Sequence, residues 1–186
     1  MNNNNFITQK LVLVKSENLI KDIAVILLFS VLTAIGAWIE IPTKPVPFTL
    51  QTFFVLLSGA ILGARKGFYS QLIYLSMGLI GLPVFAGFSA GILKMIGPTG
   101  GYLLSFPLSA FITGYLINKR NSYFWALFSV TVGMILVFLL GTIYLNFVYF
   151  KDIYKSIAYG FVIFSWWDAI KIIAVASIYK KFIGIK

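Results

Sequence analysis

The chain has 186 residues, of which 60% are hydrophobic and 11% are charged, and its formal net charge is +10. A soluble domain is about half apolar and about a quarter charged, so this composition excludes an ordinary soluble fold and requires a lipid bilayer as solvent. The sequence contains no cysteine and no histidine, which excludes disulfide bonds, serine–histidine catalytic sites and histidine-based metal sites, and we expect no metal.

Residues 1–21 are polar at first and then mix apolar with charged positions, which predicts a cytoplasmic or interfacial segment ahead of the first membrane span. A cleaved signal peptide is not expected, because the first apolar run starts late and is too long. The basic residues lie singly or in pairs between apolar runs. A nucleic-acid-binding protein gathers them on one face, so we expect no nucleic acid as a partner.

Six apolar segments follow and predict an all-α integral membrane protein with six transmembrane helices in a single domain, 1–186. They run over Ile23–Ile41, Phe48–Leu62, Gly67–Leu82, Gly101–Ile117, Tyr123–Phe147 and Ile157–Tyr179. The second, third and fourth are short of the roughly 20 residues that a span needs, which short helices accommodate by borrowing loop residues or thinning the bilayer.

The positive-inside rule predicts that both termini are cytoplasmic. With that orientation, ten basic residues lie inside and four outside, and Lys171 lies within a span. The ten are Lys10, Lys15, Lys21, Arg65, Lys66, Lys119, Arg120, Lys180, Lys181 and Lys186. The four are Lys44, Lys94, Lys151 and Lys155.

Two connections on the predicted outer side are unusual. The segment 41–48 holds three prolines, which force extended or turn backbone. The segment 83–100 is rich in glycine yet also apolar, whereas a solvated loop would be polar. It is therefore either a re-entrant packing segment or an extracellular lid over a ligand pocket.

Asp168 and Lys171 lie in the middle of the sixth predicted span, where ionisable side chains are costly and usually functional. Their i, i+3 spacing places both on one helical face. They form either a ligand site or an interhelical salt bridge. Trp166 lies beside them and either lines a pocket or faces lipid.

Three further groups are candidates for binding. Gln51, in an apolar segment, needs a polar partner, which is either another helix or a ligand. The string GPTGGY over 97–102 places backbone amides at a helix start, where a carboxylate is favoured. Ser30 and Ala34 are small residues four apart, which favours internal helix packing or docking to a partner. A nucleotide-binding P-loop pattern does not occur in the sequence.

These motifs resemble the BioY family, the biotin-specific S components of energy-coupling factor transporters. The strings that carry the resemblance are PVPFTLQTFFVLLSGAILGARKG, GLIGLPVFAG and GPTGGYLLSFPLSAFITG, between about Ile41 and Gly114. The resemblance resumes at Asp168 and Lys171. One residue and one segment depart from the family pattern. Ser30 replaces the first alanine of a docking motif, and the loop GFSAGILKM is less glycine-rich than the family form.

The resemblance implies a six-helix S-component fold in the bacterial plasma membrane, with a biotin pocket near the outer surface under the loops after the first and third helices. It also implies high-affinity biotin capture without enzymatic activity, and Ser30 and Ala34 as docking residues. The implied partners are a transmembrane coupling protein and two cytosolic ATPases, so ATP is used by the partners and this chain needs no cofactor. Whether the chain also forms a homo-oligomer is left open by the resemblance.

The chemistry of biotin suits these residues. Asp168 and Gln51 suit the ureido ring, and Lys171, Lys94 or the amides at Gly100 and Gly101 suit the carboxylate. Phe85, Trp166 and Tyr102 suit the apolar parts. Two alternatives stay open: an S component for another vitamin, and an intramembrane enzyme, for which only aspartate or lysine chemistry remains, with Asp152 in an outer connection.

Overall fold

The computed structural model describes residues 19–161 and 165–183, and it is almost entirely helical. The long helices are α2 (Leu19–Trp38), α3 (Gln51–Leu62), α4 (Ala64–Leu79), α6 (Gly100–Ile117), α7 (Tyr123–Leu145) and α9 (Ser165–Ile183). The short elements are β1 (Glu40–Ile41), β2 (Phe48–Thr49), α5 (Ile92–Ile96), the π-helical turn η1 (Asn146–Phe150) and α8 (Ile153–Gly160). Apart from Leu19–Lys21, which begin α2, the predicted N-terminal segment lies outside the described residues.

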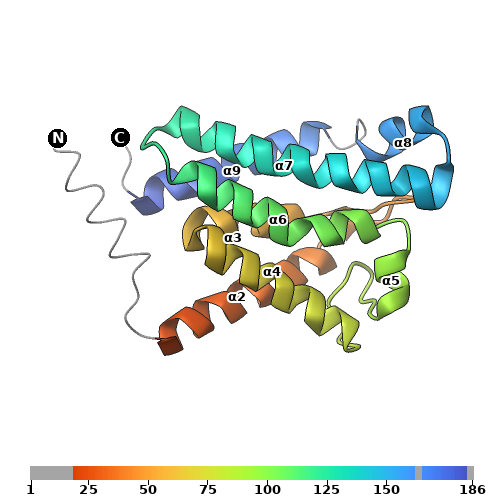
Figure 1. Cartoon of the computed structure of the whole chain (residues 1–186), viewed down its shortest axis with the longest axis horizontal. Coiled ribbons are helices and arrows are strands. Elements are labelled where there is room, and N and C mark those ends of the chain that lie inside the picture. The colour runs from red at the N-terminus through yellow and green to blue at the C-terminus, as the bar shows by residue number, and fades with distance from the viewer. Residues whose placement is uncertain (1–18, 162–164, 184–186) are drawn as a thin grey trace.

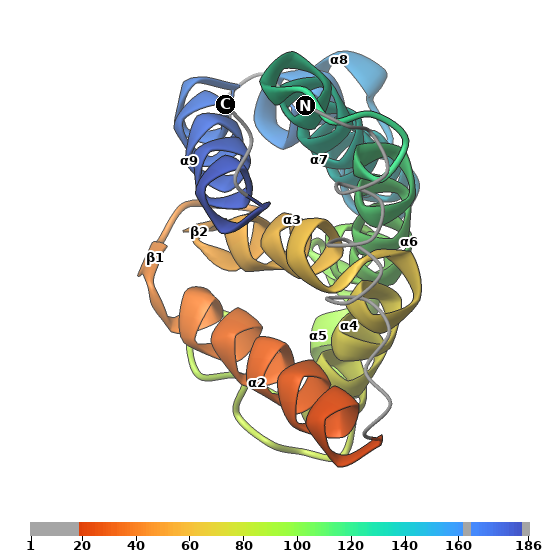
Figure 2. The same cartoon turned by 90° about the vertical axis from the view of Figure 1, so that its left-hand side faces the viewer.

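Helix α3 is the centre of the bundle and contacts α2, α4, α6, α7 and α9. In the end-on view it lies between α2 and α4 on one side and α6, α7 and α9 on the other (Figure 2). Its 12 residues span only about 18 Å, well short of the roughly 30 Å of a bilayer core. The surrounding helices shield it from lipid, and the space beyond its first residue, Gln51, is where the cavities described below lie.

The connections gather at the two ends of the bundle (Figure 1). One end carries the hairpin β1–β2, α5 and α8, and the opposite end carries the α3–α4 junction, the α6–α7 connection and the last turn of α9. Lys44, Lys94, Lys151 and Lys155 lie at the first end. Arg65, Lys66, Lys119, Arg120, Lys180 and Lys181 lie at the second. The two groups of basic residues that the sequence separates are thus separated in space.

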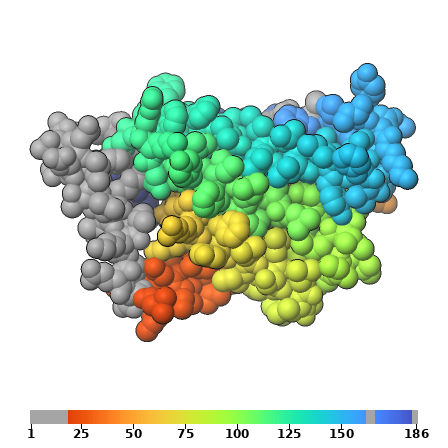
Figure 3. Space-filling model, viewed as in Figure 1, coloured from red at the N-terminus to blue at the C-terminus, as the bar shows by residue number. Residues whose placement is uncertain are grey.

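The outer surface of the helices is apolar, as a bilayer requires. Large apolar side chains are exposed along one stripe of α6 and along α7, on the face that Figure 3 shows in green and cyan. On α6 they are Leu104, Leu108, Phe111 and Tyr115, and on α7 they include Phe128, Ile135, Leu139 and Ile143. Within the described residues three helices, Leu19–Trp38, Gly100–Ile117 and Tyr123–Phe150, are long and apolar enough to cross a membrane. This is a membrane protein.

The prediction of one uninterrupted sixth span over Ile157–Tyr179 is wrong. Helix α8 ends at Gly160 and α9 begins at Ser165. Helix α8 begins at Ile153, ahead of the predicted span, because the Asp152 carboxylate caps it. The carboxylate accepts hydrogen bonds from the amides of Tyr154 and Lys155 at 3.0 and 3.2 Å. Asp168 consequently lies in the first turn of α9 and not in the middle of a span.

Ser30 and Ala34 pack inside the chain, and their role as docking residues stays a prediction. Both are buried, at 0% and 2% exposure. The Ser30 hydroxyl donates to the carbonyl of Ser70 on α4 at 2.7 Å. Small side chains let α2 approach its neighbours closely, and the alternative interpretation, internal packing, is the one that this structure shows.

Candidate functional site

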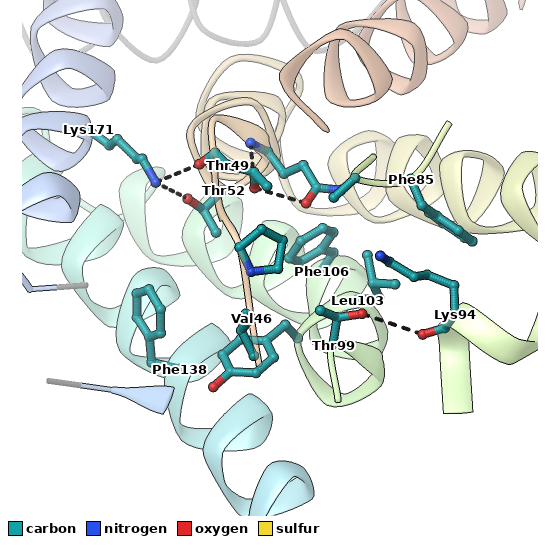
Figure 4. Close-up of a pocket in the computed structure, with 14 residues that line it drawn as sticks. Val46, Thr49, Thr52, Phe85, Lys94, Thr99, Leu103, Phe106, Phe138 and Lys171 are labelled. Carbon is teal, nitrogen blue, oxygen red and sulfur yellow. Dashed lines mark hydrogen bonds between the residues drawn. The ribbon is translucent and has the colours of Figure 1, made fainter. Parts of the chain in front are cut away.

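Two adjoining cavities lie at the end of the bundle that carries the hairpin and α5. The inner cavity measures about 40 Å³ and the outer cavity about 360 Å³. The polar side chains of the inner cavity are Thr49, Gln51, Thr52, Lys94, Thr99 and Lys171 (Figure 4). Its apolar walls include Val46, Phe85, Tyr102, Leu103, Phe106 and Phe138. Residues from five helices and two connections therefore converge on one small space.

The hairpin holds the cavity roof against the end of α2. Its strands pair antiparallel, with Glu40 opposite Thr49 and Ile41 opposite Phe48. The amide of Leu50 donates to the carbonyls of Gly36 and Ile39 at 3.0 and 3.1 Å, which fixes the entry into α3. The three prolines thus form the extended turn that their spacing predicts, and it brings Val46 and Pro47 over the cavity.

Lys171 ties α9 to the start of α3. Its ammonium donates to Asp168 Oδ1 at 2.8 Å, to the Thr49 carbonyl at 2.8 Å and to the Thr52 hydroxyl at 3.0 Å. An ammonium has three donors, so these three acceptors use them all. Asp168 is 3% exposed and lies behind Lys171, and it is not among the residues that line the inner cavity. The pair is buried, the Lys171 ammonium is saturated, and Asp168 Oδ2 has no hydrogen-bond partner among the described residues.

Gln51 belongs to a hydrogen-bond chain that reaches the loop after α4. Its side-chain carbonyl accepts from the Thr49 hydroxyl at 2.9 Å, and its amide donates to the Tyr74 hydroxyl. Tyr74 in turn donates to the carbonyl of Val84 at 3.2 Å. A glutamine amide has two N–H donors and two acceptor lone pairs, so one of each stays available to a ligand.

Lys94 faces both cavities and has no partner among the described residues. It comes from α5, lines both cavities, and points toward Leu103 and Phe106 (Figure 4). Within residues 19–161 and 165–183 no acceptor lies within hydrogen-bonding distance of its ammonium, and it makes no ion pair. An unpaired cation beside an apolar cavity is a ready partner for an anionic group.

The first half of the segment 83–100 is packed down and not free. Phe85 is fully buried, lies against Gly78 of α4 at a point where no side chain would fit, and contacts the Tyr74 ring edge-on at 5.7 Å. The Trp38 indole donates to the carbonyl of Pro83 at 2.9 Å, and its ring stacks on Phe88 at 5.2 Å. This half is a packing segment, whereas the second half contains α5 and carries Lys94 to the cavities.

The other site residues that the sequence predicts do not all lie at the cavities. The Tyr102 ring lines the inner cavity, while its hydroxyl donates to the carbonyl of Gly160 at 2.8 Å. Gly100 and Gly101 are buried where α6 packs closely on Met95 and Tyr144, and the Gly100 amide donates to the Gly97 carbonyl at 2.9 Å. Trp166 is 62% exposed, stacks on Trp167 at 4.8 Å, and does not line either cavity as described.

Several lining residues escaped the sequence reasoning. Thr49 and Thr52 flank Gln51 in the run TLQT, and the concentration of polar groups in an apolar segment was a usable signal. Phe106 and Phe138 gave no such signal, because aromatic residues are common throughout these helices. Only the fold shows that their rings face this end of α3.

Replacing Tyr74 with phenylalanine is expected to lower the free energy of unfolding by about 1–3 kcal/mol, because Gln51 and Val84 lose a buried hydrogen-bond partner. Chemical denaturation in detergent measures this. Tyr69→Phe on the same helix is the matched control, since Tyr69 is exposed and its loss should cost less than about 0.5 kcal/mol. Equal stability of the two variants would show that the chain through Tyr74 contributes nothing.

Comparison with known proteins places these features in a family. The BioY family model matches residues 4–185. The chain is 48% identical to the biotin transporter BioY of Thermotoga maritima over 151 residues, covering 81% of this chain and 89% of that protein. It is 45% identical to the probable biotin transporter BioY of Pyrococcus horikoshii over 125 residues, covering 67% and 74%.

The fold has a counterpart among solved structures. A 2.1 Å crystal structure of the S-component for biotin from an ECF-type ABC transporter superposes with a TM-score of 0.83. The match covers 90% of this chain and 94% of that one, at 28% sequence identity. Sequence and fold thus agree on the assignment that the motifs suggested, and the chain belongs to the BioY family.

Proposed function

We propose that this chain binds biotin in the inner cavity and takes part in biotin uptake, as the substrate-capturing S component of an energy-coupling factor transporter. The observation that carries the proposal is the arrangement of polar side chains around a cavity with apolar walls. A buried wall of Thr49, Gln51, Thr52 and Lys171 lies at one side, and the unpaired Lys94 faces the cavity from α5. Aromatic and aliphatic side chains fill the walls between them.

Each part of biotin has a complement in this arrangement. The ureido ring offers two N–H donors and a carbonyl acceptor, which suit the free N–H and lone pair of Gln51 and the hydroxyls of Thr49 and Thr52. The thiophane ring and aliphatic chain suit the rings of Tyr102 and Phe106. The cavity of about 40 Å³ holds only a few waters, so binding requires the walls to separate.

For the carboxylate, the geometry favours Lys94 over Lys171. All three donors of Lys171 are engaged by protein acceptors, so a carboxylate would have to displace one of them. Lys94 meets the ligand with nothing to displace in the described structure. Lys171 and Asp168 then act by holding Thr49 and Thr52 in place, and the amides at the start of α6 are left as a second, weaker candidate.

Equilibrium binding of tritiated biotin to the purified chain tests this function. We expect saturable binding of about one biotin per chain, displaced by unlabelled biotin and not by riboflavin or thiamine, because the complementarity above is to a ureido ring and a carboxylate. Displacement by another vitamin at equal concentration would favour an S component for that vitamin. A folded chain with no saturable biotin binding would refute the proposal.

We further infer that α2, α3, α4, α6, α7 and α9 are the six membrane helices, in a bacterial plasma membrane, with both termini cytoplasmic. The basic residues support this orientation, since the end with Lys119, Arg120 and Lys180 holds more of them. Their cations lie 4.5–5.5 Å from the rings of Tyr115, Trp125 and Tyr123, the pairing of aromatic and basic residues that is typical of a membrane interface.

Single cysteines test the orientation cleanly, because the chain has none of its own. In intact cells we expect a membrane-impermeant maleimide to label Lys151→Cys, at the end that carries the cavities, and to spare Arg120→Cys at the opposite end. Permeabilised cells serve as the control, since both positions should then react. The reverse labelling pattern would overturn both the orientation and the placement of the binding site.

Active transport needs an energy source such as ATP hydrolysis. The sequence of this chain contains no nucleotide-binding P-loop pattern. We propose that a transmembrane coupling protein and two cytosolic ATPases supply that energy, and that ATP is hydrolysed by those partners. Since Ser30 and Ala34 are buried, a partner that approaches α2 would meet its exposed apolar face instead, which includes Leu27, Val31 and Ile35.

A further inference from the structure

The outer cavity is larger than a passage to the inner one requires. It measures about 360 Å³ and lies between the proline-rich turn and the second half of the segment 83–100. Lys94, Thr99, Pro47 and Ala86 line both cavities, so a ligand that passes Lys94 enters the outer cavity directly. A ligand of two connected parts would therefore occupy both.

The outer cavity is lined by charges of both signs. Glu40 and Lys44 face it together with Lys94. In the part of the chain that the structure describes, Asp22, Asp152 and Asp168 each pair with a lysine, at N–O distances of 2.6, 3.8 and 2.8 Å. Glu40 is the acidic residue in those ranges without an ion pair, and Lys44 has none either.

Gly87 leaves room beside the Glu40 carboxylate. A side-chain Cβ at position 87 would lie 3.5 Å from Glu40 Oε1 and would begin to cover it on the cavity side. The backbone there has φ of +72°, which glycine adopts without strain. An unpaired carboxylate, an unpaired ammonium and open space between them are complementary to a group that carries one positive and one negative charge.

We propose that the outer cavity binds the zwitterionic head of a biotin amide formed with an amino acid, such as the ε-amide of lysine. This inference rests on the proposed binding of biotin in the inner cavity. The amide lies at Lys94, which then donates to its neutral carbonyl oxygen. The amino-acid chain continues outward, its ammonium pairs with Glu40, and its carboxylate pairs with Lys44.

Four probes separate the parts of this ligand in competition against tritiated biotin. They are biotin, Nε-biotinyl-lysine, biotinyl-cadaverine, which keeps the amine alone, and biotin pentylamide, which carries no charge on its tail. In the unmodified chain we expect Nε-biotinyl-lysine to bind about threefold to tenfold more tightly than the pentylamide, the range for partly exposed charge pairs.

Two variants assign the charges. Glu40→Gln should remove the advantage of biotinyl-cadaverine over the pentylamide and leave biotin affinity unchanged. Lys44→Gln should weaken Nε-biotinyl-lysine and leave biotinyl-cadaverine unchanged. Lys155→Gln is the matched control, because Lys155 is exposed at the same end but pairs with Asp152.

Each outcome of these competition measurements either supports or overturns the inference. If Nε-biotinyl-lysine and the pentylamide bind equally to the unmodified chain, or if Glu40→Gln weakens every probe alike, the outer cavity does not recognise an amino-acid head and the inference is wrong. If biotin itself does not bind, the proposed function fails, which is a different result. Tight biotin binding together with equal binding of the amides would leave the proposed function standing and overturn this inference alone.

Discussion

Replacing Lys171 with methionine is expected to lower the free energy of unfolding by about 3–5 kcal/mol, the largest stability effect that we predict. Lys171 is 9% exposed, and its removal strands the Asp168 carboxylate, which is 3% exposed. Removing one partner of a buried ion pair is costly because the remaining charge is left without compensation. Equilibrium unfolding in detergent measures the loss.

A second substitution shows whether the stranded charge is the cause. Asp168→Asn added to Lys171→Met removes that charge, and the double variant should recover much of the lost stability. Lys155→Met is the control, because Lys155 and Asp152 have the same i, i+3 spacing but are exposed and 3.8 Å apart, and its loss should cost less than about 1 kcal/mol. If Lys171→Met were as mild as the control, the buried pair would have no special part in the fold.

Replacing Lys94 with methionine is expected to weaken biotin binding by about 10- to 150-fold. A hydrogen bond to a charged group is worth about 1.5–3 kcal/mol, and 1.4 kcal/mol corresponds to about tenfold in affinity. Because the lost partner is the carboxylate, the variant should bind biotin amide almost as well as biotin. Titration of the purified chain with both ligands measures this preference directly.

Lys171→Met distinguishes the two lysines in the same titration. If Lys94 meets the carboxylate, Lys171→Met keeps the preference for biotin over biotin amide, even where overall affinity falls through the loosened wall. Lys151→Met, a change at the same end of the bundle but away from both cavities, should bind like the unmodified chain. A preference that survives in Lys94→Met and vanishes in Lys171→Met would assign the carboxylate to Lys171.

The helical segments were predictable because apolar composition and basic flanks are local properties of the sequence. The interruption of the last segment was not, because the break after Gly160 lies in an apolar run, and the Asp152 cap that starts α8 lies ahead of the predicted segment. The same limit applies to Trp166: helical spacing cannot decide whether a ring beside Asp168 faces a cavity or the surroundings.

The lining of the candidate cavity was predictable in part, from polar residues that stand in apolar segments. Gln51, Lys94 and Lys171 line the inner cavity, and each is a polar group in apolar surroundings, which narrows its options. The sequence could not show that Lys171 is saturated, because that depends on Thr49 and Thr52 across the bundle, nor that Lys94 has no partner among the described residues. For Ser30 and Ala34 the sequence could not decide between two roles, since small residues suit internal packing and docking equally.

Trp38 joins the last turn of α2 to the segment that covers the cavity, through its hydrogen bond to Pro83 and its stacking on Phe88. A tilt of α2 would therefore act on the base of that segment through these two contacts. Binding free energies at two sites of one protein are linked reciprocally. A partner that binds α2 in one tilt would thus change the affinity of the cavity for its ligand by the same factor by which the bound ligand changes the affinity for the partner.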